Sequence, residues 1–493
     1  LPICPGKVDI SNLHCYNSTH KGQRRSYPGN PRVSAPFLLT GVRRKDRLVM
    51  MGKYTREDIL RMAEEEDVEF IRLQFTDMFG TMKNIAIPFG KLEKAMDNEC
   101  VIDASSMESF YRNEEEDMYL HPDLDTFCIL PWRPQQGKVA RFICDIYKAD
   151  GTPYKESPRY ILQEAVKKAK EKGYTFKVNP ECEFFLFHTD DNGAPTTLTH
   201  ERAGFMDLSP VDLGENARRD IVLTLEEMGY EVASSHHEIA PGQHEIDFTM
   251  SDVMETADKL MTFKVAVRTI AKRHGLHATF MPKPKAEVNG SGMHINMALY
   301  QDGKNVFEDP ADRLGLSREA YGFLAGVMEH IRGMTAVFNP LVNSYKRLVP
   351  GFEAPSDVTW SATQRTALVK VCRGMKEEKT IELRSPDPSA NPYLVFALCL
   401  EAGIHGMEQG MEAPPELVKS IRELSEEEKK EQGIQALPEN LSVALFEMEQ
   451  DPWVEETLGA SFLEHYKKGK RKEWKSYMKQ VSEWELAQYL YQI

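Results

Sequence analysis

The sequence lacks the features that define membrane proteins, disulfide-stabilised proteins and general nucleic-acid-binding proteins. No stretch of its 493 residues approaches the roughly 18 to 20 consecutive apolar residues that a membrane-spanning helix needs. The eight cysteines have no regular spacing and form no CxxC pair, which indicates cytoplasmic thiols rather than a disulfide framework or a zinc site. The net charge of −15 argues against binding to the phosphate backbone of nucleic acids.

The first 50 residues differ from the rest of the chain in charge and composition. They contain nine Lys and Arg against two Asp, a charge of about +7, which leaves about −22 for the remainder. They are rich in Pro, Gly and Ser, have no helical periodicity and lack the apolar core of a secretory signal. We therefore expect residues 1–50 to form a basic, disordered leader, with a transit peptide as the alternative.

The chain beyond residue 50 divides into a small and a large domain. A turn at Asp150–Pro153 marks the expected boundary, which gives domains of 51–153 and 154–493. The small domain combines one helix, Thr55–Glu66 with Thr55 as its N-cap, with several strands, so we expect an α+β fold. The expected strands are Val68–Phe75, Asn84–Ile87 and Val139–Ile146.

The large domain does not alternate strand and helix in the regular way of a doubly wound parallel sheet. The expected helices are Pro158–Lys172, Glu215–Met228, Val253–His274, Arg318–Phe338, Pro392–Gly410, Leu441–Glu449, Pro452–Lys467 and Glu473–Tyr489. The expected strands are Asn179–Phe187, the two halves of Tyr230–Phe248, His277–Met281, Met293–Tyr300, strands near Trp360–Val371, and Thr380–Arg384.

The stretch Asn179–Phe187 places two acids in an apolar strand. Phe184–Phe187 mark the strand as buried, and the alternation of side chains puts Glu181 and Glu183 on the same face. Two like charges about 4 Å apart repel by about 4 kcal/mol at an effective dielectric of 20, so the pair needs a proton, an arginine or a metal ion. The alternative is a strand with one charged and solvated face.

A second group of acids surrounds a turn at Pro241–Gly242. His236–Glu238 precedes the turn and His244–Asp247 follows it. A strand pair closed by this turn would bring Glu238 and Glu245 together. The alternatives are a surface histidine pair before the turn and a solvated strand face after it.

Two further strands carry candidate ligands. The Gly-rich loop in Asn289–Asn296 runs into a strand that contains His294, for which a hydrogen-bonded core histidine is the alternative. Glu382 and Arg384 are two residues apart in an alternating strand and therefore share a face. Together the strands supply six candidate ligands: Glu181, Glu183, Glu238, Glu245, His294 and Glu382. Five carboxylates and one imidazole favour hard cations such as Mg²⁺ or Mn²⁺ over zinc.

A loop bounded by Pro and Gly, Asn343–Pro355, carries both signs of charge. Its Arg347 and Glu353 are candidates to reach over a pocket and close it. Arg365 and Arg384 add positive charge for carboxylate or phosphate oxygens. An ordinary surface loop with salt bridges is the alternative.

Taken together, these motifs resemble the glutamine synthetases of the bacterial type I class, and the resemblance covers nearly all of Met51–Ile493. Its most specific segments are Asn179–Phe187, His236–Phe248, Asn289–Asn296, Asn343–Pro355 and Glu382–Tyr393. The chain is similar to the shorter, non-adenylylated subgroup typical of Gram-positive bacteria, because the segment after Leu437–Pro438 lacks the tyrosine that is modified in the other subgroup.

The resemblance implies an α+β protein with a small N-terminal β-grasp-like domain and a larger catalytic domain, built on a curved antiparallel sheet with flanking helices. It implies an ATP-dependent glutamate–ammonia ligase of glutamine biosynthesis and nitrogen metabolism, acting in the cytoplasm on glutamate, ammonium and ATP. It also implies two Mg²⁺ or Mn²⁺ ions per active site, and a homo-oligomer, a dodecamer of two hexameric rings. No nucleic-acid or membrane partner is expected.

The resemblance also implies a role for each matching residue. One metal would bind Glu183, Glu238 and Glu245, and the other would bind Glu181, His294 and Glu382. Asn289 and Gly290 would bind glutamate, and Arg347 and Arg384 would bind its carboxylate and the acyl phosphate. The nucleotide would contact Asn296, Arg365 and Lys370. Arg112 would be a further substrate-binding residue. Glu353 would close the site and accept a proton, and Asp103 would bind and deprotonate ammonium in a neighbouring subunit.

Some positions depart from the family pattern near the ammonium and nucleotide sites. Ala104 follows the ammonium aspartate in place of Gly, and Phe205 lacks the hydroxyl expected there. Ala233 replaces a Glu, and Lys370 replaces a phosphate-contacting Arg and loses its bidentate geometry. Three alternatives therefore stay open: a γ-glutamyl ligase for an organic amine, a non-catalytic regulatory ring protein, and a two-metal hydrolase.

Overall fold

The computed structural model describes residues 54–105, 107, 117–133, 136–371 and 378–493. They belong to a unit that extends from Lys53 to Ile493. The expected leader, residues 1–50, lies outside the described residues. Within the described part of the chain, no helix combines the length and the apolar character that crossing a membrane requires.

A five-stranded sheet in the order β2-β1-β5-β4-β3 forms the N-terminal domain. β1 and β5 are parallel, and the other neighbours are antiparallel. The strands are β1 (Val68–Thr76), β2 (Met82–Pro88), β3 (Cys100–Asp103), β4 (Asp117–Ile129) and β5 (Lys138–Lys148), and the helices are α1 (Arg56–Glu65) and α2 (Leu92–Met96). Ile59 and Ala63 of α1 are fully buried in the core of this domain.

The sequence predicted part of this domain correctly. Helix α1 begins after Thr55, which forms a capping box with Asp58, and β1, β2 and β5 lie where strands were expected. Strands β3 and β4 were missed. The middle of β4, His121–Asp125, is polar and only partly buried, so it lacks the apolar alternation by which a strand is recognised.

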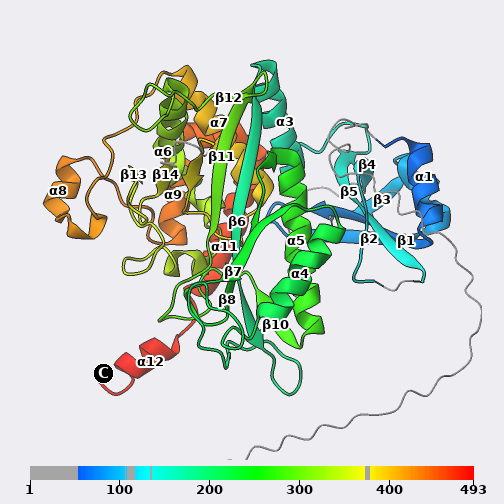
Figure 1. Cartoon of the computed structure of the whole chain (residues 1–493), viewed down its shortest axis with the longest axis horizontal. Coiled ribbons are helices and arrows are strands. Elements are labelled where there is room, and N and C mark those ends of the chain that lie inside the picture. The colour runs from blue at the N-terminus through cyan, green and yellow to red at the C-terminus, as the bar shows by residue number, and fades with distance from the viewer. Residues whose placement is uncertain (1–53, 106, 108–116, 134–135, 372–377) are drawn as a thin grey trace, which may run out of the picture. The chain divides into compact units, whose positions relative to one another are not determined.

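The larger domain is built on a curled, ten-stranded sheet with long strands β6 and β11 at its centre (Figure 1). Its main order is β13-β14-β15-β11-β6-β8-β7. The strands are β6 (Thr175–His188), β7 (Val232–His237), β8 (Gln243–Phe248), β9 (Ser251–Asp252), β10 (Leu276–Thr279), β11 (Met293–Gln301), β12 (Lys304–Asn305), β13 (Trp360–Ser361), β14 (Val369–Val371) and β15 (Ile381–Leu383). β13 and β14 pair in parallel, so the sheet is mixed rather than antiparallel throughout; the predicted α+β class is confirmed.

The two faces of β6 have opposite chemistry. Val178, Cys182 and Phe184 are fully buried in the main apolar core, which also contains the apolar residues of helix α5. Glu181 and Glu183 alternate with them and project from the other face. The core thus fixes the strand, and the strand fixes the position of the two acids.

Helices surround this sheet, and most lie within one or two residues of their predicted bounds. They are α3 (Pro158–Glu171), α4 (Glu215–Glu227), α5 (Val253–Arg273), α6 (Arg318–Phe338), α7 (Pro392–Glu408), α8 (Glu426–Glu431), α9 (Leu441–Gln450), α10 (Pro452–Leu458), α11 (Ala460–Tyr477) and α12 (Glu483–Tyr489). The predicted helix Pro452–Lys467 is wrong, because Gly459 adopts a φ of 89° and separates α10 from α11. The predicted start at Glu473 is also wrong, since α11 continues through that region.

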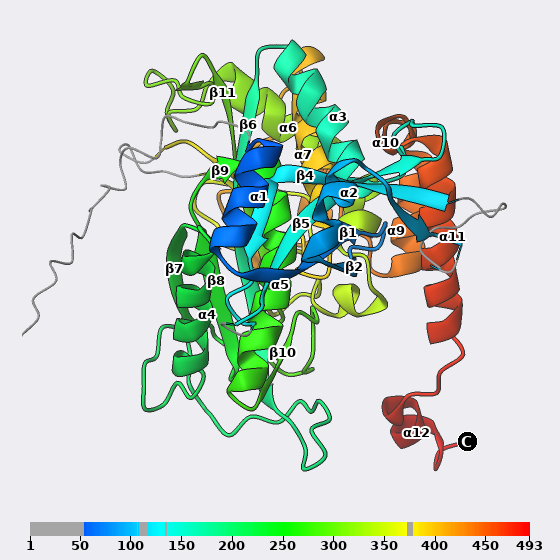
Figure 2. The same cartoon turned by 90° about the vertical axis from the view of Figure 1, so that its right-hand side faces the viewer.

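A buried arginine joins the two domains. Arg159, near the start of α3, is 5% exposed. Its guanidinium donates at 2.6 Å to Asp145 of β5 and at 2.6 Å to Asp123 of β4. Figure 2 labels these two neighbouring strands of the N-terminal sheet. It also donates to both oxygens of Asp258 in α5, at 3.0 and 2.9 Å. One cation therefore compensates three carboxylates from both domains.

We expect Arg159→Leu to destabilise the protein by about 3–5 kcal/mol, because the substitution leaves buried carboxylates without their counter-charge. Arg219→Leu is the matched control. Arg219 is 67% exposed and pairs with Asp220 at 3.3 Å, so its loss should change stability by less than about 1 kcal/mol. Thermal unfolding of both variants checks this, and equal shifts would contradict the role assigned to Arg159.

Candidate functional site

Acidic and histidine side chains collect across the polar face of β6 and its neighbours. Antiparallel pairing sets Glu181 opposite His294 of β11, and Glu183 opposite Glu245 of β8. Glu382 of β15 lies opposite Asn296 of β11, which extends the row by one more strand. The register of four strands therefore produces the site from residues that are far apart in the sequence.

The first cluster consists of Glu181, His294 and Glu382, whose ligand atoms lie within 4.8 Å of one another. His294 Nδ1 lies 3.3 Å from Glu181 and 3.8 Å from Glu382. Three neighbours stabilise the carboxylates: Asn296 donates to Glu181 at 2.8 Å, and Lys370 and Arg384 donate to Glu382 at 2.7 and 2.5 Å. The cluster is thus held by side chains of two other strands, β11 and β14, and by Arg384 directly after β15.

These contacts fix the ionisation of the first cluster. Burial would raise the pKa of Glu181, but hydrogen bonds from His294 and Asn296 outweigh it and lower this pKa to about 2. Burial, reinforced by the charge of Arg384, lowers the pKa of His294 and keeps the imidazole neutral. An ionised carboxylate beside a neutral imidazole is the state in which both groups bind a metal ion.

The second cluster lies around the β7–β8 turn. The ligand atoms of His236, Glu238 and Glu245 lie within 4.8 Å of one another, and Glu183 lines the cavity beside Glu238. The predicted meeting of Glu238 and Glu245 is confirmed. A surface histidine pair is excluded, because His237 is fully buried and His236 is partly buried.

The positive charge near the second cluster does not offset the burial of its acids. Burial, followed by the charge of Glu238, raises the pKa of Glu183 to about 8. Burial and the charge of Glu183 also raise the pKa of Glu245 far above its usual range. A cluster of three carboxylates, in which the ionisation of Glu183 and Glu245 is disfavoured, fits a divalent cation, and an oxygen-rich donor set fits Mg²⁺ or Mn²⁺.

The glycine loop lies at the edge of this cavity, which Asn289, Gly290, Arg347, Glu353 and Arg384 line together with the acids. A Cβ on Gly290 would lie 2.2 Å from the carbonyl oxygen of Pro282, so the loop requires glycine there. The glycine loop and the acids of the second cluster therefore line the same cavity.

Arg347 does not reach over the pocket from a flexible loop, and this prediction is wrong. It follows a short 3-10 helix, η3 (Val342–Lys346), and is 2% exposed. Its guanidinium donates to the carbonyl oxygens of Ser385 at 2.7 Å and Arg384 at 3.1 Å. Backbone acceptors therefore fix the cation inside the cavity, whereas Glu353 lies in the exposed loop above it.

Three predicted residues lie elsewhere or outside the described chain. Arg365 is exposed in the segment between β13 and β14. Asp103 is exposed at the end of β3 in the N-terminal domain, where it accepts hydrogen bonds from Ser105. Arg112 lies outside the described residues.

Gln243 is a site residue that the sequence did not reveal. It is 1% exposed, and its Nε2 donates to Glu183 at 2.6 Å and to the carbonyl oxygen of Gly290 at 3.1 Å. It thereby joins the acidic strand to the glycine loop. An amide carries no charge, so a search for clustered charges passes over it; its place at the start of β8, directly after the turn, was the available signal.

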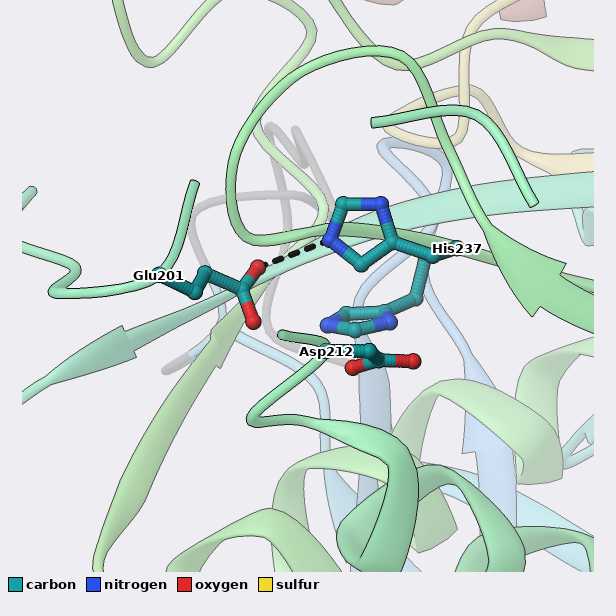
Figure 3. Close-up of side chains that lie close together, drawn as sticks. Glu201, Asp212 and His237 are labelled. Atoms are coloured by element: carbon teal, nitrogen blue, oxygen red, sulfur yellow. Dashed lines mark hydrogen bonds and ion pairs between the residues drawn. The ribbon is translucent and has the colours of Figure 1, made fainter. Parts of the chain in front are cut away.

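A third buried cluster, of Glu201, Asp212, His237 and His244, borders the β7–β8 turn. Figure 3 shows the carboxylate of Glu201 directed at His237, from which it is 2.8 Å distant. Arg218 donates to Asp212 at 2.7 Å and to His244 Nδ1 at 2.8 Å, so a guanidinium already supplies the positive charge. We interpret this cluster as structural support for the turn that carries Glu238.

Phe205 lies at the rim of the second cluster. Its ring meets the ring of His236 edge-on, with centroids 5.5 Å apart, and it is 48% exposed. The aromatic position expected near the ammonium site is therefore present, but without a hydroxyl group.

Family models match both domains of the chain. The model described as glutamine synthetase, beta-Grasp domain, matches residues 67–149, and the model described as glutamine synthetase, catalytic domain, matches residues 155–489. Among curated relatives, the glutamine synthetase of Clostridium saccharobutylicum is 56% identical over 440 residues, which is 89% of this chain and 99% of the relative. The glutamine synthetase of Staphylococcus aureus strain Mu50 is 51% identical with the same coverage.

Solved structures show the same fold. A GmaS complex with ADP superposes with a TM-score of 0.80 and 31% identity, covering 88% of this chain and 99% of the other. The glutamine synthetase of Plasmodium falciparum superposes with a TM-score of 0.78 at 24% identity, with the same coverage, and supports the fold alone. These findings confirm the family, enzyme class and reaction that the motifs predicted: the chain belongs to the glutamine synthetase family of ATP-dependent glutamate–ammonia ligases.

Proposed function

We propose that the cavity on the polar face of β6 is the active site in which glutamate, ATP and ammonium react. The observation that supports this most is the convergence of two acidic clusters, the glycine loop and a fixed arginine on one cavity. Asn289 and Gly290 bind the glutamate backbone, and Arg347 and Arg384 bind its carboxylate and the acyl phosphate.

We propose two divalent cations, Mg²⁺ or Mn²⁺, as cofactors. Glu183, Glu238 and Glu245 would hold one, with His236 beside it, and Glu181, His294 and Glu382 would hold the other. When bound, the cations offset the negative charge of the phosphates and of the forming tetrahedral centre. The raised pKa values of Glu183 and Glu245 are the feature of this chain that fits them, because the neighbouring cations do not offset the burial of these acids.

The reaction proceeds in two steps. An oxygen of the glutamate side chain attacks the γ-phosphorus of ATP, which breaks the bond to ADP and gives γ-glutamyl phosphate. Ammonia then attacks the acyl carbon, Glu353 accepts a proton from the adduct, and phosphate leaves to give glutamine. Lys370 and Asn296, beside the first cluster, contact the nucleotide phosphates, and Arg365 turns in from its exposed position when ATP binds.

Asp103 completes the site from another subunit in this proposal. It is exposed on the N-terminal domain, where it can bind ammonium and accept its proton, and Arg112 follows in the same domain.

We propose a dodecamer of two hexameric rings. Helix α12 and the residues after it carry exposed apolar side chains that a subunit interface would cover, since Trp484 is 63% and Leu490 is 66% exposed. The five described cysteines are free thiols, which fits the proposed cytoplasmic location.

The reaction can be tested by measuring ADP and glutamine together, with Mg²⁺, ATP and glutamate, in the presence of ammonium or methylamine. We expect ammonium-dependent release of equal amounts of ADP and glutamine. Glu353→Ala should lower kcat by about 10²-fold or more, because the adduct loses its proton acceptor. Glu456→Ala, at an exposed position on α10, is the control. Release that requires methylamine, or no release, would contradict the proposal.

Metal binding can be tested without catalysis. We expect Mg²⁺ at a hundredfold excess over its dissociation constant to stabilise the protein by about 2.7 kcal/mol relative to EDTA, because the ion binds the folded state only. Glu245→Gln should reduce this thermal shift, whereas Glu456→Gln should retain it. A shift that is identical in all three proteins would place the metal elsewhere.

A further inference from the structure

Lys283 occupies a buried position between two loops of the active site. It lies in the segment that connects β10 to β11 and is 6% exposed. Its backbone is fixed by Asn343, whose side chain accepts from the Lys283 amide at 2.8 Å and donates to its carbonyl at 3.0 Å. Hydrogen bonds to both backbone groups of Lys283 therefore fix the point from which its side chain extends.

The ammonium group of Lys283 contacts both loops at once. Nζ donates to the carbonyl oxygen of Val288 at 2.5 Å, directly before Asn289 and Gly290 of the glycine loop. It also lies 3.3 Å from the centroid of the Phe352 ring, directly before Glu353. A buried cation against an aromatic face is strongly attracted, because little water competes for it.

The aliphatic part of Lys283 also supports the glycine loop. A Cβ placed on Gly290 would lie 3.2 Å from Lys283 Cδ, so the lysine stem packs directly against the loop backbone. Phe352 has a second contact that holds it in place, because Arg422 donates a hydrogen bond to its carbonyl oxygen at 2.9 Å. The loop that carries Glu353 is thus held from both sides, and Lys283 provides the attachment that faces the substrate.

We propose that Lys283 is a positioning residue that couples the glutamate-binding loop to the closed position of the Glu353 loop. The inference rests on the role proposed for Glu353. When the lysine holds both loops, the closed Glu353 loop excludes water from γ-glutamyl phosphate until ammonia attacks. Lys283 itself takes no proton and touches no reacting atom.

Loss of this coupling has a specific chemical consequence. When the Glu353 loop opens, water attacks the acyl carbon of γ-glutamyl phosphate, the bond to phosphate breaks, and glutamate is regenerated. The net reaction is then the hydrolysis of ATP to ADP and phosphate, without glutamine. A lysine with a merely structural role would instead lower ADP and glutamine formation equally.

The experiment compares the full-length protein with Lys283→Met, Lys283→Arg, Phe352→Leu and the Met/Leu double variant. Lys285→Met, in the same segment, is the control for loss of one positive charge. ADP and glutamine are measured in the same reactions, with and without ammonium, and KM is determined for glutamate and for ATP. Thermal unfolding and Mg²⁺ binding confirm that each variant is folded.

We expect Lys283→Met to raise the ratio of ADP to glutamine several-fold and the KM for glutamate roughly tenfold, with the KM for ATP unchanged. Lys283→Arg should restore most of the coupling, because a guanidinium also stacks on an aromatic ring. Phe352→Leu should also raise the ratio of ADP to glutamine, but it should raise the KM for glutamate less than Lys283→Met does. The double variant should have the same ratio of ADP to glutamine as Lys283→Met, or a lower one.

Two results would overturn the inference. One is a Lys283→Met enzyme that is slow but still forms ADP and glutamine in equal amounts. The other is uncoupling in Lys283→Met but not in Phe352→Leu, which would exclude the contact between them; this variant also decides the matter if the lysine variants do not fold. Failure of the proposed function is distinct, because the unsubstituted enzyme would then form no glutamine.

Discussion

The structure depends on the cost of placing like charges together on a buried face of a sheet. Glu183 and Glu245 lie opposite each other on adjacent strands, and both are less than 9% exposed. Directly opposed like charges destabilise a strand pair, and burial increases their repulsion because water no longer screens it. A fold that retains such a pair must place positive charge beside it, from neighbouring arginines or from bound cations.

The two clusters meet this requirement in different ways. Lys370 of β14 and Arg384, directly after β15, donate to Glu382. Burial would raise the pKa of Glu382, but the charge of Arg384 and the other cationic groups beside it together outweigh burial and lower this pKa. In the second cluster the raised pKa values of Glu183 and Glu245 show that the protein does not compensate the acids to the same extent. The first cluster is therefore preformed by protein contacts, whereas the second would depend more strongly on the cation proposed to bind there.

The sequence was sufficient wherever a local period or a turn determined the geometry. Alternation placed Glu181 and Glu183 on one face of β6, and the Pro241–Gly242 turn brought Glu238 and Glu245 together. It was insufficient where long-range pairing decided the outcome. β4 is recognisable as a strand only through its pairing with β3 and β5, and the burial of Arg347 depends on carbonyl groups about 40 residues later in the chain.

Site residues that belong to no charge cluster and no periodic pattern were the hardest to predict. Gln243 and Lys283 each donate to one loop carbonyl, that of Gly290 and that of Val288, and no pattern of residue types distinguishes such contacts from those of ordinary surface residues. Their positions follow from the rigid elements around them: a strand end for Gln243, and a backbone clamped by Asn343 for Lys283. The sheet thus fixes the positions of the charged side chains, and a few buried hydrogen bonds fix the loops relative to the sheet. Since loops of this kind must open for substrates and close for chemistry, a small number of attachments suits them better than continuous packing.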